Sequence, residues 1–338
     1  MVIEELILSR NQVKNAGKIL KNTHSSREDR DSAFNILSEW RSRHVVPLEL
    51  AYKLLKKNVE IYDKKAIFGK RLKRAVSIIQ KLNRFQSGLG EMQDIAGCRA
   101  IVSNYQHLQD IERRLNKSRS ISKNKGKNYI LEPKEDGYRG IHKIYKYNGN
   151  KTFCKGLLVE IQLRTKLQHS WATTVEIVDI IENEKLKNGQ GSEDWKRFFY
   201  LISNEFAKLD KLPSIDETPH ENEIFDLSEK LSVIVKLQAY KTVLTNFSSK
   251  IVPKKFILLW LKKKERVVQF FNFDSYESAK EMYIAMEKEY TENSDFDVLL
   301  VNVESMNDLK KAYPNYFADS SEFVQQLEKI LERRISKD

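Results

Sequence analysis

The chain has 338 residues, of which 41% are apolar, and it carries a net charge of +12 at pH 7. This length suits one large domain or two ordinary ones, and the apolar fraction is high enough for a buried core. The chain contains no apolar run of about 18 residues that could span a membrane, and its acidic beginning does not resemble a signal peptide. We therefore expect a cytoplasmic protein without a membrane partner. Cys98 and Cys154 are the only cysteines, which argues against a disulfide framework and a C-x-x-C zinc site. The positive charge favours a polyanionic or phosphate-rich partner.

Apolar residues recur at helical spacing through the first 60 residues, and a basic region that we also expect to be helical covers residues 50–84. In its last helix Lys73, Ser77 and Lys81 stand four residues apart and would line one face, with Arg71 in the first turn. A row of this kind at a helix N-terminus suits a chain of phosphates. A plain solvent-exposed face would produce the same pattern.

Two predicted strands carry carboxylates. Residues 157–164 alternate apolar side chains with Glu160, Gln162 and Arg164, which predicts a strand with one polar face. Asp94 begins a second run of small and β-branched residues. A polar face at period two is usually the wet side of a sheet. Two carboxylates at the ends of core strands are nevertheless a candidate Mg²⁺ site, because this ion binds oxygen ligands and shares them with substrate phosphates.

An aromatic residue lies between these strands in a basic setting. Residues 117–129 have the composition of a flexible basic loop, and an Asp-Gly turn between two strand-like runs directly precedes Tyr138. Lys134, Arg139 and His142 lie close to this tyrosine in the sequence. Its ring could stack on a base while the cations hold phosphates, although a tyrosine that packs within a hairpin fits equally well.

The last part of the chain predicts a separate small module. A proline-containing acidic segment at residues 212–223 is the best candidate linker, and a helix of about 25 residues follows it. Residues 254–338 predict three strands and two helices, without a carboxylate pair or a glycine-rich phosphate loop. Binding or regulation is therefore the expected role. Tyr313-Pro314-Asn315-Tyr316 looks exposed, although two tyrosines at a proline turn also suit local packing.

Four motifs occur in a fixed order, namely GKRLKRAVSIIQK, MQDIAGCR, PKEDGYRGIH and EIQLRT. Together they resemble the synthetase domain of the RelA/SpoT family, over about Lys70 to Asp179. The resemblance implies a mixed-sheet, nucleotidyltransferase-like core flanked by helices. Together with the small C-terminal module, the expected fold class is α+β. It also implies a Mg²⁺-dependent enzyme that moves the β,γ-pyrophosphate of ATP to a ribose 3′-hydroxyl, normally of GTP or GDP.

The resemblance assigns the ATP site by position. Arg71 and Arg99 would enclose the adenine, and Lys73, Ser77 and Lys81 would hold the phosphates. These roles agree with the basic row described above.

The resemblance also assigns the catalytic and acceptor residues. Asp94 and Glu160 would bind Mg²⁺, and Glu160 with Gln162 would help to deprotonate the attacking hydroxyl. Tyr138 would stack on the acceptor base. The acceptor site would be completed by Lys134, His142 and Arg164.

Parts of the chain resemble a subgroup of the family more closely. Val175 and Glu176 replace the usual Glu-His pair, and the QHSWATTVE string looks like the toxic small alarmone synthetases, some of which pyrophosphorylate the 3′ CCA end of tRNA and stop translation. The appended module resembles the fused toxin–antitoxin proteins called CapRel, in which it covers the nucleotide site until a phage capsid protein releases it. Tyr313 and Tyr316 match the Tyr-x-x-Tyr motif of that blockade. We expect no zinc, because this region lacks cysteines.

The chain is thereby divided into N-terminal helices (1–60), a synthetase domain (61–195), a helical linker (196–250) and a regulatory module (251–338). Our first hypothesis is a pyrophosphokinase that modifies tRNA, is inhibited by its own module and serves in anti-phage defence. The second keeps the chemistry but uses GTP or GDP as acceptor. The third is a non-catalytic nucleotide or RNA sensor, against which the two carboxylates Asp94 and Glu160 argue.

Overall fold

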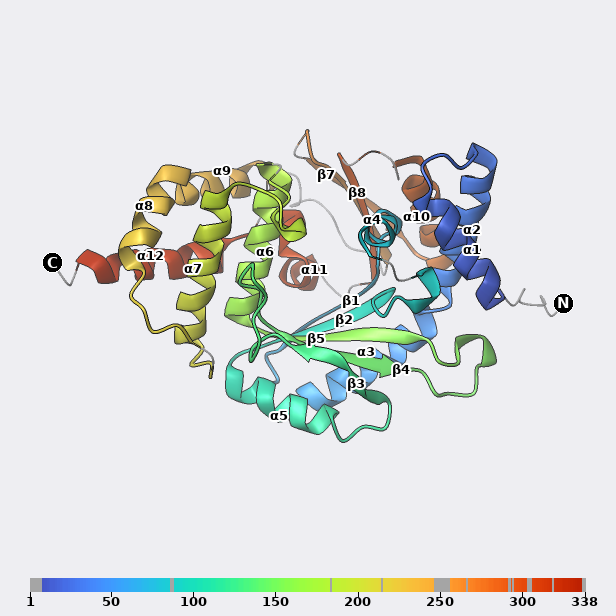
Figure 1. Ribbon diagram of the computed structural model, residues 1–338, viewed down its shortest axis with the longest axis horizontal. Helices are drawn as coiled ribbons and strands as arrows, with labels where there is room; N and C mark the ends of the chain where they lie inside the picture. The colour runs from blue at the N-terminus through green and yellow to red at the C-terminus, as the bar shows by residue number, and fades with distance from the viewer. Residues whose placement is uncertain are drawn as a thin grey trace.

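The structure is a computed structural model that describes residues 8–335, except residues 86–87, 183, 214, 246–255, 266, 291–292, 294, 303–305 and 318. A five-stranded sheet forms its centre, and a three-stranded sheet stands above one edge of it (Figure 1). Within the described ranges, no helix is long and apolar enough to cross a bilayer.

The central sheet is mixed, which confirms the expected α+β class. Its strands in spatial order are β1 (Ile67–Leu72), β2 (Ala96–Val102), β5 (Leu158–Thr165), β4 (Ile141–Lys146) and β3 (Ile121–Asn128). Only β2 and β5 run parallel, whereas the other neighbours are antiparallel. Their register places Gly97 beside Glu160 and Arg99 beside Gln162, so the two polar strands lie together at the centre of the sheet.

Helices cover the sheet in separate groups. Below it in Figure 1 lie α3 (Val45–Val59) and α5 (Tyr105–Leu115), which share its main apolar core. A second core joins α1 (Arg10–Lys21), α2 (Arg27–Ser42) and α4 (Ala75–Arg84). The third core joins α6 (Lys166–Ile181), α7 (Glu193–Leu209), α8 (Glu221–Leu231), α9 (Val233–Thr245) and α12 (Ser321–Ile335).

Local sequence explains these helices well. Ser192 caps α7 by accepting the N–H of Trp195, and Glu193 and Asp194 complement the helix dipole in the first turn. The apolar positions of α7 then recur at helical spacing and are buried against the neighbouring helices.

The C-terminal residues form an antiparallel sheet in the order β7-β6-β8, and all of the predicted elements are present. The strands are β6 (Phe256–Lys262), β7 (Val267–Phe273) and β8 (Phe296–Asn302). One face packs against α10 (Tyr276–Tyr290), and the other packs against α11 (Met306–Ala312) and the short helix η4 (Pro314–Phe317). The last helix, α12, leaves this sheet and buries Phe323 and Leu327 among α6, α7 and α8.

Two predicted segments have a different structure. The basic pattern predicts a helix that includes residues 67–72, but these residues form β1. Arg71 is therefore a strand residue, and the helix begins only at Ala75. The predicted loop at residues 117–129 contains the edge strand β3. In both places pairing with a neighbouring strand overrides the local pattern, and a lysine-rich edge strand is a common protection against aggregation.

Two further expectations were wrong at the C-terminal end. The helix predicted to follow the linker is broken into α8 and α9 at Ser232, whose φ of 52° is left-handed. Tyr313 and Tyr316 are buried, with 5% and 1% of their surfaces exposed. A sequence pattern cannot show this burial, because the covering surface comes from β1 and β8.

The junction of β5 and α6 contains a partly buried carboxyl group. Thr165 caps α6 and donates a hydrogen bond from Oγ1 to Asp210 at the end of α7. Burial raises the pKa of Asp210 from 3.8 to about 6, although the hydrogen bond from Thr165 opposes this shift. Between these two values the folded state binds more protons than the unfolded state, so stability should fall as the pH rises through this window.

We therefore expect Asp210→Asn to remove this pH dependence and to stabilise the protein at pH 8 by on the order of 2 kcal/mol. Urea unfolding at pH 5 and pH 8 measures both effects. Replacement of the exposed Asp226 of α8 with asparagine is the control, and it should leave the pH dependence unchanged. Equal pH dependence in wild type and Asp210→Asn would show that Asp210 is not the responsible group.

Candidate active site

The structure brings the two predicted carboxylates into one cavity. Asp94 lies just before β2, and Glu160 lies in the neighbouring parallel strand β5. Both line a cavity of about 110 Å³. The predicted site residues that share this cavity are Arg71, Lys73, Asp94, Arg99, Glu160, Gln162 and Tyr313.

Asp94 is held by two lysines and keeps one oxygen available. Its Oδ2 accepts hydrogen bonds from Lys81 (2.7 Å) and Lys73 (3.3 Å). Its Oδ1 is buried without a hydrogen-bond partner among the described residues. Burial lowers the pKa of Lys73, an effect that Asp94 opposes and Lys81 increases. A buried acceptor without a partner is unfavourable, so this oxygen suits a cation or a donor supplied by a ligand.

Glu160 is fixed by its neighbours on both oxygens. His142 Nδ1 lies 2.8 Å from Oε1, and Gln162 Nε2 donates to Oε2 at 2.6 Å. Burial alone would raise the pKa of Glu160, but these partners and Lys73 outweigh it and hold the pKa at about 2. A carboxylate with so low a pKa is a poor proton acceptor near neutral pH. The low pKa of Glu160 therefore favours a role in cation binding over one in general-base catalysis.

Tyr138 belongs to a closed ring of hydrogen bonds that includes Glu160. Its hydroxyl lies 2.6 Å from His142 Nε2 and accepts a hydrogen bond from Arg164 Nη2 at 3.0 Å. Arg164 Nη2 also donates to Gln162 Oε1 (3.2 Å), which closes the ring back to Glu160. Such a network holds all its members in one arrangement.

The cations expected near Tyr138 are only partly present. The ammonium of Lys134 lies 4.8 Å from the centre of the tyrosine ring, and the Arg164 guanidinium lies 5.1 Å from it. Arg139 points elsewhere and donates hydrogen bonds to Ser203 and Asn204 of α7. The expectation that Arg139 faces a ligand is therefore wrong, since it anchors the Tyr138 loop to α7.

Arg71 and Arg99 lie on the neighbouring strands β1 and β2, beside the C-terminal module. Arg99 Nη2 donates to the carbonyl oxygen of Ala312, and the Tyr313 hydroxyl donates to the carbonyl oxygen of Lys70 (2.7 Å). Burial lowers the pKa of Arg99 to about 10, and the nearby Arg164 and Arg71 add to the shift. The place assigned to adenine is therefore occupied by backbone and side chain of the module.

The predicted helical row of Lys73, Ser77 and Lys81 is only partly confirmed. Lys73 precedes the helix, whereas Ser77 lies in the first turn of α4 and Lys81 follows one turn later. Lys73 and Lys81 meet at Asp94, but Ser77 does not line the cavity.

The N-terminus of α4 is contacted by two carboxylates of the module. Glu287 of α10 accepts the N–H of Ala75 at 2.9 Å with Oε1, and its Oε2 forms a buried ion pair with Arg41. Asp297 of β8 pairs with Arg74, the residue that precedes the helix. The helix that was predicted to bind phosphates therefore receives acidic side chains at its positive end.

Sequence reasoning missed three charged or titratable groups close to this site, of which only His169 is buried. Glu176 of α6 pairs with Lys187, and although burial opposes it, Lys187 and Arg71 hold the pKa of Glu176 at about 2. His169 is buried, and burial and two nearby arginines lower its pKa, so its imidazole is neutral. Of the three, only Glu176 was indicated by the sequence, because it departs from the Glu-His pair that is usual in the family. Lys187 stood in a polar loop, and His169 was placed on the polar side of its helix.

The residues present fit a magnesium ion that is shared with a substrate. Among the described residues, no cluster of three or more His, Cys, Asp or Glu side chains could hold a metal by itself. Asp94 with its unpartnered oxygen and Glu160 offer two carboxylates in one cavity. Mg²⁺ is usually bound by one or two carboxylates together with substrate phosphates, so this donor set is sufficient once a nucleotide is present.

The candidate site lies within a region that matches known proteins. Residues 70–178 match a family described as the region found in RelA / SpoT proteins. The GTP pyrophosphokinase YjbM of Bacillus subtilis (strain 168) is 36% identical over 107 residues, which are 30% of this chain and 51% of YjbM. The chain thus spans about half the length of this curated relative.

Two solved structures show a weaker likeness to this chain. The small alarmone synthetase 1 of Bacillus subtilis is 24% identical, and the match covers 57% of this chain and 96% of that one with a TM-score of 0.44. A GTP pyrophosphokinase family protein of Streptococcus pneumoniae is 23% identical, with coverages of 51% and 88% and a TM-score of 0.44. Residues 70–178, which contain the motifs at the site, therefore match the region found in RelA and SpoT proteins.

Proposed function

We propose that the chain is an ATP-dependent pyrophosphokinase that transfers the β,γ-pyrophosphate of ATP to a ribose 3′-hydroxyl. The observation that carries this proposal is the convergence of Asp94 and Glu160 with Lys73 and Arg99 in one cavity, within the matched region. The two carboxylates Asp94 and Glu160 beside these cations argue against a sensor without catalysis.

In this reaction the 3′-oxygen attacks the β-phosphorus, the bond from that phosphorus to the α–β bridging oxygen breaks, and AMP leaves. Asp94 and Glu160 would hold Mg²⁺, which neutralises charge on the phosphate oxygens. Lys73 and Lys81 place two further positive charges beside Asp94. The hydrogen-bonded ring around Tyr138 would hold the acceptor in a fixed position relative to the Glu160 carboxylate. Much of the rate enhancement would then come from positioning.

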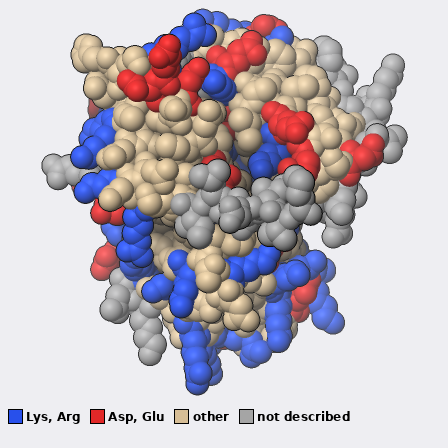
Figure 2. Space-filling model, turned by 90° about the vertical axis from the view of Figure 1, so that its right-hand side faces the viewer, with Lys and Arg blue, Asp and Glu red and all other residues tan. Residues whose placement is uncertain are grey.

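The acceptor that we propose is the 3′ end of tRNA. Lys and Arg outnumber Asp and Glu by 59 to 47, and Figure 2 shows basic side chains gathered over the lower part of one face. The lower part of the molecule on this side holds α3, β3 and β4 in Figure 1. A basic surface of this kind supplies the non-specific part of RNA affinity. The second candidate is GTP or GDP, which the name of the YjbM relative favours.

A label-transfer assay separates the two acceptors. The protein is incubated with ATP labelled at the γ-phosphate and with either deacylated tRNA or GDP and GTP. Transfer to tRNA, with an affinity that falls steeply as salt rises, is the expected result. Transfer to guanosine nucleotides alone would assign the protein to alarmone synthesis. The sensor hypothesis would gain support if no label were transferred even after Tyr313 and Tyr316 of the C-terminal module are replaced with alanine.

We further propose that the C-terminal module inhibits the enzyme. Support comes from the Tyr313 hydroxyl on the Lys70 carbonyl group and from the Ala312 carbonyl oxygen on Arg99. The cavity that remains is about 110 Å³, whereas pockets for small ligands usually measure about 300 Å³ or more. ATP would therefore need the module to move. By the resemblance to CapRel proteins, a phage capsid protein would trigger this release and give the enzyme a role in anti-phage defence.

A further inference from the structure

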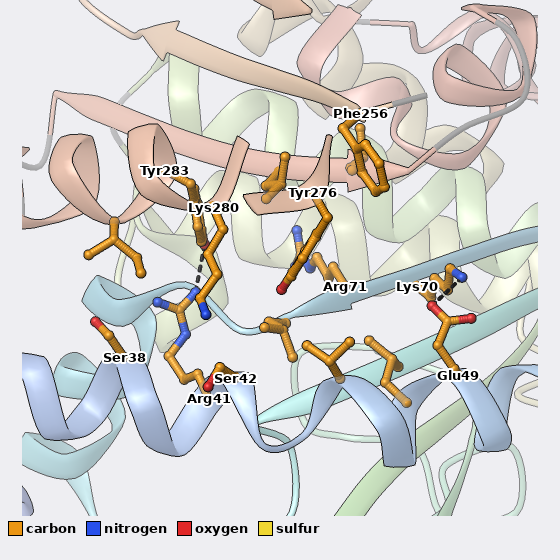
Figure 3. Close-up of a pocket in the computed structure, with 16 residues that line it drawn as sticks. Ser38, Arg41, Ser42, Glu49, Lys70, Arg71, Phe256, Tyr276, Lys280 and Tyr283 are labelled. Atoms are coloured by element: carbon orange, nitrogen blue, oxygen red, sulfur yellow. Dashed lines mark hydrogen bonds and ion pairs between the residues drawn. The ribbon is translucent and has the colours of Figure 1, made fainter. Parts of the chain in front are cut away.

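A second cavity of about 300 Å³ lies where the N-terminal helices, β1 and the C-terminal sheet meet (Figure 3). Its volume is at the lower end of the range for small-molecule pockets, about 300–1,000 Å³. One wall comes from α2, α3 and β1, and the other comes from α10, β6 and β8. It shares only Lys70 and Arg71 with the candidate active site, so it is a separate place for a ligand.

Most of this cavity is apolar. Its side walls include Val45, Leu48, Leu72, Ile284 and Leu300. Apolar walls of this kind favour a ligand with an aliphatic or aromatic part, because the transfer of apolar surface from water into such a cavity is favourable.

One end of the cavity is polar and has unused hydrogen-bonding capacity. Arg41 is 2% exposed, and its terminal nitrogens bind Glu287 and Tyr283. Arg41 Nε and the buried Oγ of Ser38 have no hydrogen-bond partner among the described residues. A buried donor that lacks an acceptor is unfavourable, so this end of the cavity calls for an acceptor from a ligand.

A lysine adds positive charge at the same end. Figure 3 shows Lys280 directed from α10 toward Arg41 and Ser42. Among the residues that the structure describes, its ammonium group forms no hydrogen bond or ion pair. Lys280 and Arg41 together carry two positive charges, whereas Glu287 supplies one negative charge to Arg41. At the opposite end Lys70 is already paired with Glu49.

We propose that this cavity binds a small amphipathic anion. Its anionic group lies at Lys280, Arg41 Nε and Ser38, and its apolar body lies between the N-terminal helices and the C-terminal sheet. The ligand touches both sides of the interface, so it stabilises the arrangement in which the module is docked. This site goes beyond the proposed function and does not depend on the acceptor of the transfer reaction.

Calorimetric titration of the full-length protein tests the proposal with three probes. Sodium decanoate represents an alkyl anion, 1-naphthoate represents an aromatic anion, and 1-decanol is the uncharged counterpart of decanoate. We expect saturable binding of at least one anion at a single site, together with a higher melting temperature. Decanol should bind about tenfold more weakly than decanoate or worse, the factor expected for one charge-assisted hydrogen bond. The better of the two anions identifies the kind of apolar body that the walls accept.

Three variants make the test specific. Lys280→Met keeps the length of the side chain but removes the charge, and it should weaken anion binding about tenfold or more. Lys288→Met is the matched control, because Lys288 lies on the same helix, pairs with Asp31 and does not line the cavity. Leu300→Trp fills the cavity from β8 and should abolish binding while unfolding remains cooperative.

Four results would overturn the proposal. These are no binding of either anion, equal binding of decanol, unchanged affinity in Lys280→Met, and undiminished binding in Leu300→Trp.

Discussion

Replacement of Glu160 with glutamine is expected to reduce pyrophosphate transfer by at least about 10³-fold, with little change in the KM for ATP. The variant keeps the shape of the side chain but removes the negative charge that we assign to Mg²⁺ binding. Asp94→Asn should have a similar effect. Its amide oxygen would face Lys73 and Lys81, so the amide nitrogen would replace Oδ1, the oxygen that has no hydrogen-bond partner among the described residues. The label-transfer assay measures both, in a background where alanine replaces Tyr313 and Tyr316 so that inhibition by the module does not obscure the result.

Glu112→Gln is the matched control for this experiment. Glu112 is also ion-paired, with Lys143 of β4, and its side chain is 17% exposed compared with 19% for Glu160. It should keep nearly full turnover. A Glu160→Gln enzyme with more than about a tenth of the control turnover would refute the assignment. The two possible roles of Glu160 are also separable, because added Mg²⁺ should partly restore activity if the lost function is metal binding, but not if it is proton transfer.

The double substitution Tyr313→Ala and Tyr316→Ala is expected to release the enzyme and raise transfer by about 10²-fold or more. Removing a buried aromatic side chain typically costs about 3–5 kcal/mol, which is enough to invert an equilibrium between docked and released states. Both rings are buried, and their hydroxyl groups bond to the Lys70 carbonyl group and to Asp297. Expression of this variant should be toxic to cells, and the toxicity should disappear when Glu160→Gln is added.

Tyr290→Ala tests whether any damage to the module has the same effect. Tyr290 contacts Trp260 and Phe296 within the module and does not line the nucleotide cavity, so transfer should stay low. Equal activation by Tyr290→Ala would indicate general unfolding rather than a specific blockade. Harmless expression of the double variant, with Glu160 intact, would contradict the toxin hypothesis.

The structure also changes the design of a truncation experiment. Cutting the chain near Lys250, which lies outside the described residues, removes α12 along with the C-terminal sheet. Phe323 and Leu327 of α12 are fully buried among α6, α7 and α8. A truncated chain would therefore expose apolar surface in its catalytic half, and point substitutions give a cleaner answer.

The amino-acid sequence determined the elements that depend on local pattern. The alternation around Glu160 predicted β5, and apolar residues at helical spacing predicted the helices of the N-terminal part. It also identified Asp94, Glu160, Lys73 and Arg99 as one set, because the motifs that contain them resemble a known family. These signals are local, since side-chain periodicity acts over a few residues.

Tertiary structure alone decided where distant segments meet. Arg71 lies in a strand because β1 pairs with β2, and Arg139 serves α7 rather than a ligand. Tyr313 is buried because β1 covers it, and the Glu287 carboxylate reaches the N–H of Ala75 across 212 residues of sequence. Contacts of this kind depend on chain topology and on the packing of whole elements. Neither produces a periodic pattern of side chains in the sequence. The contacts of Ala312 and Tyr313 beside the candidate active site and the second cavity both belong to this class.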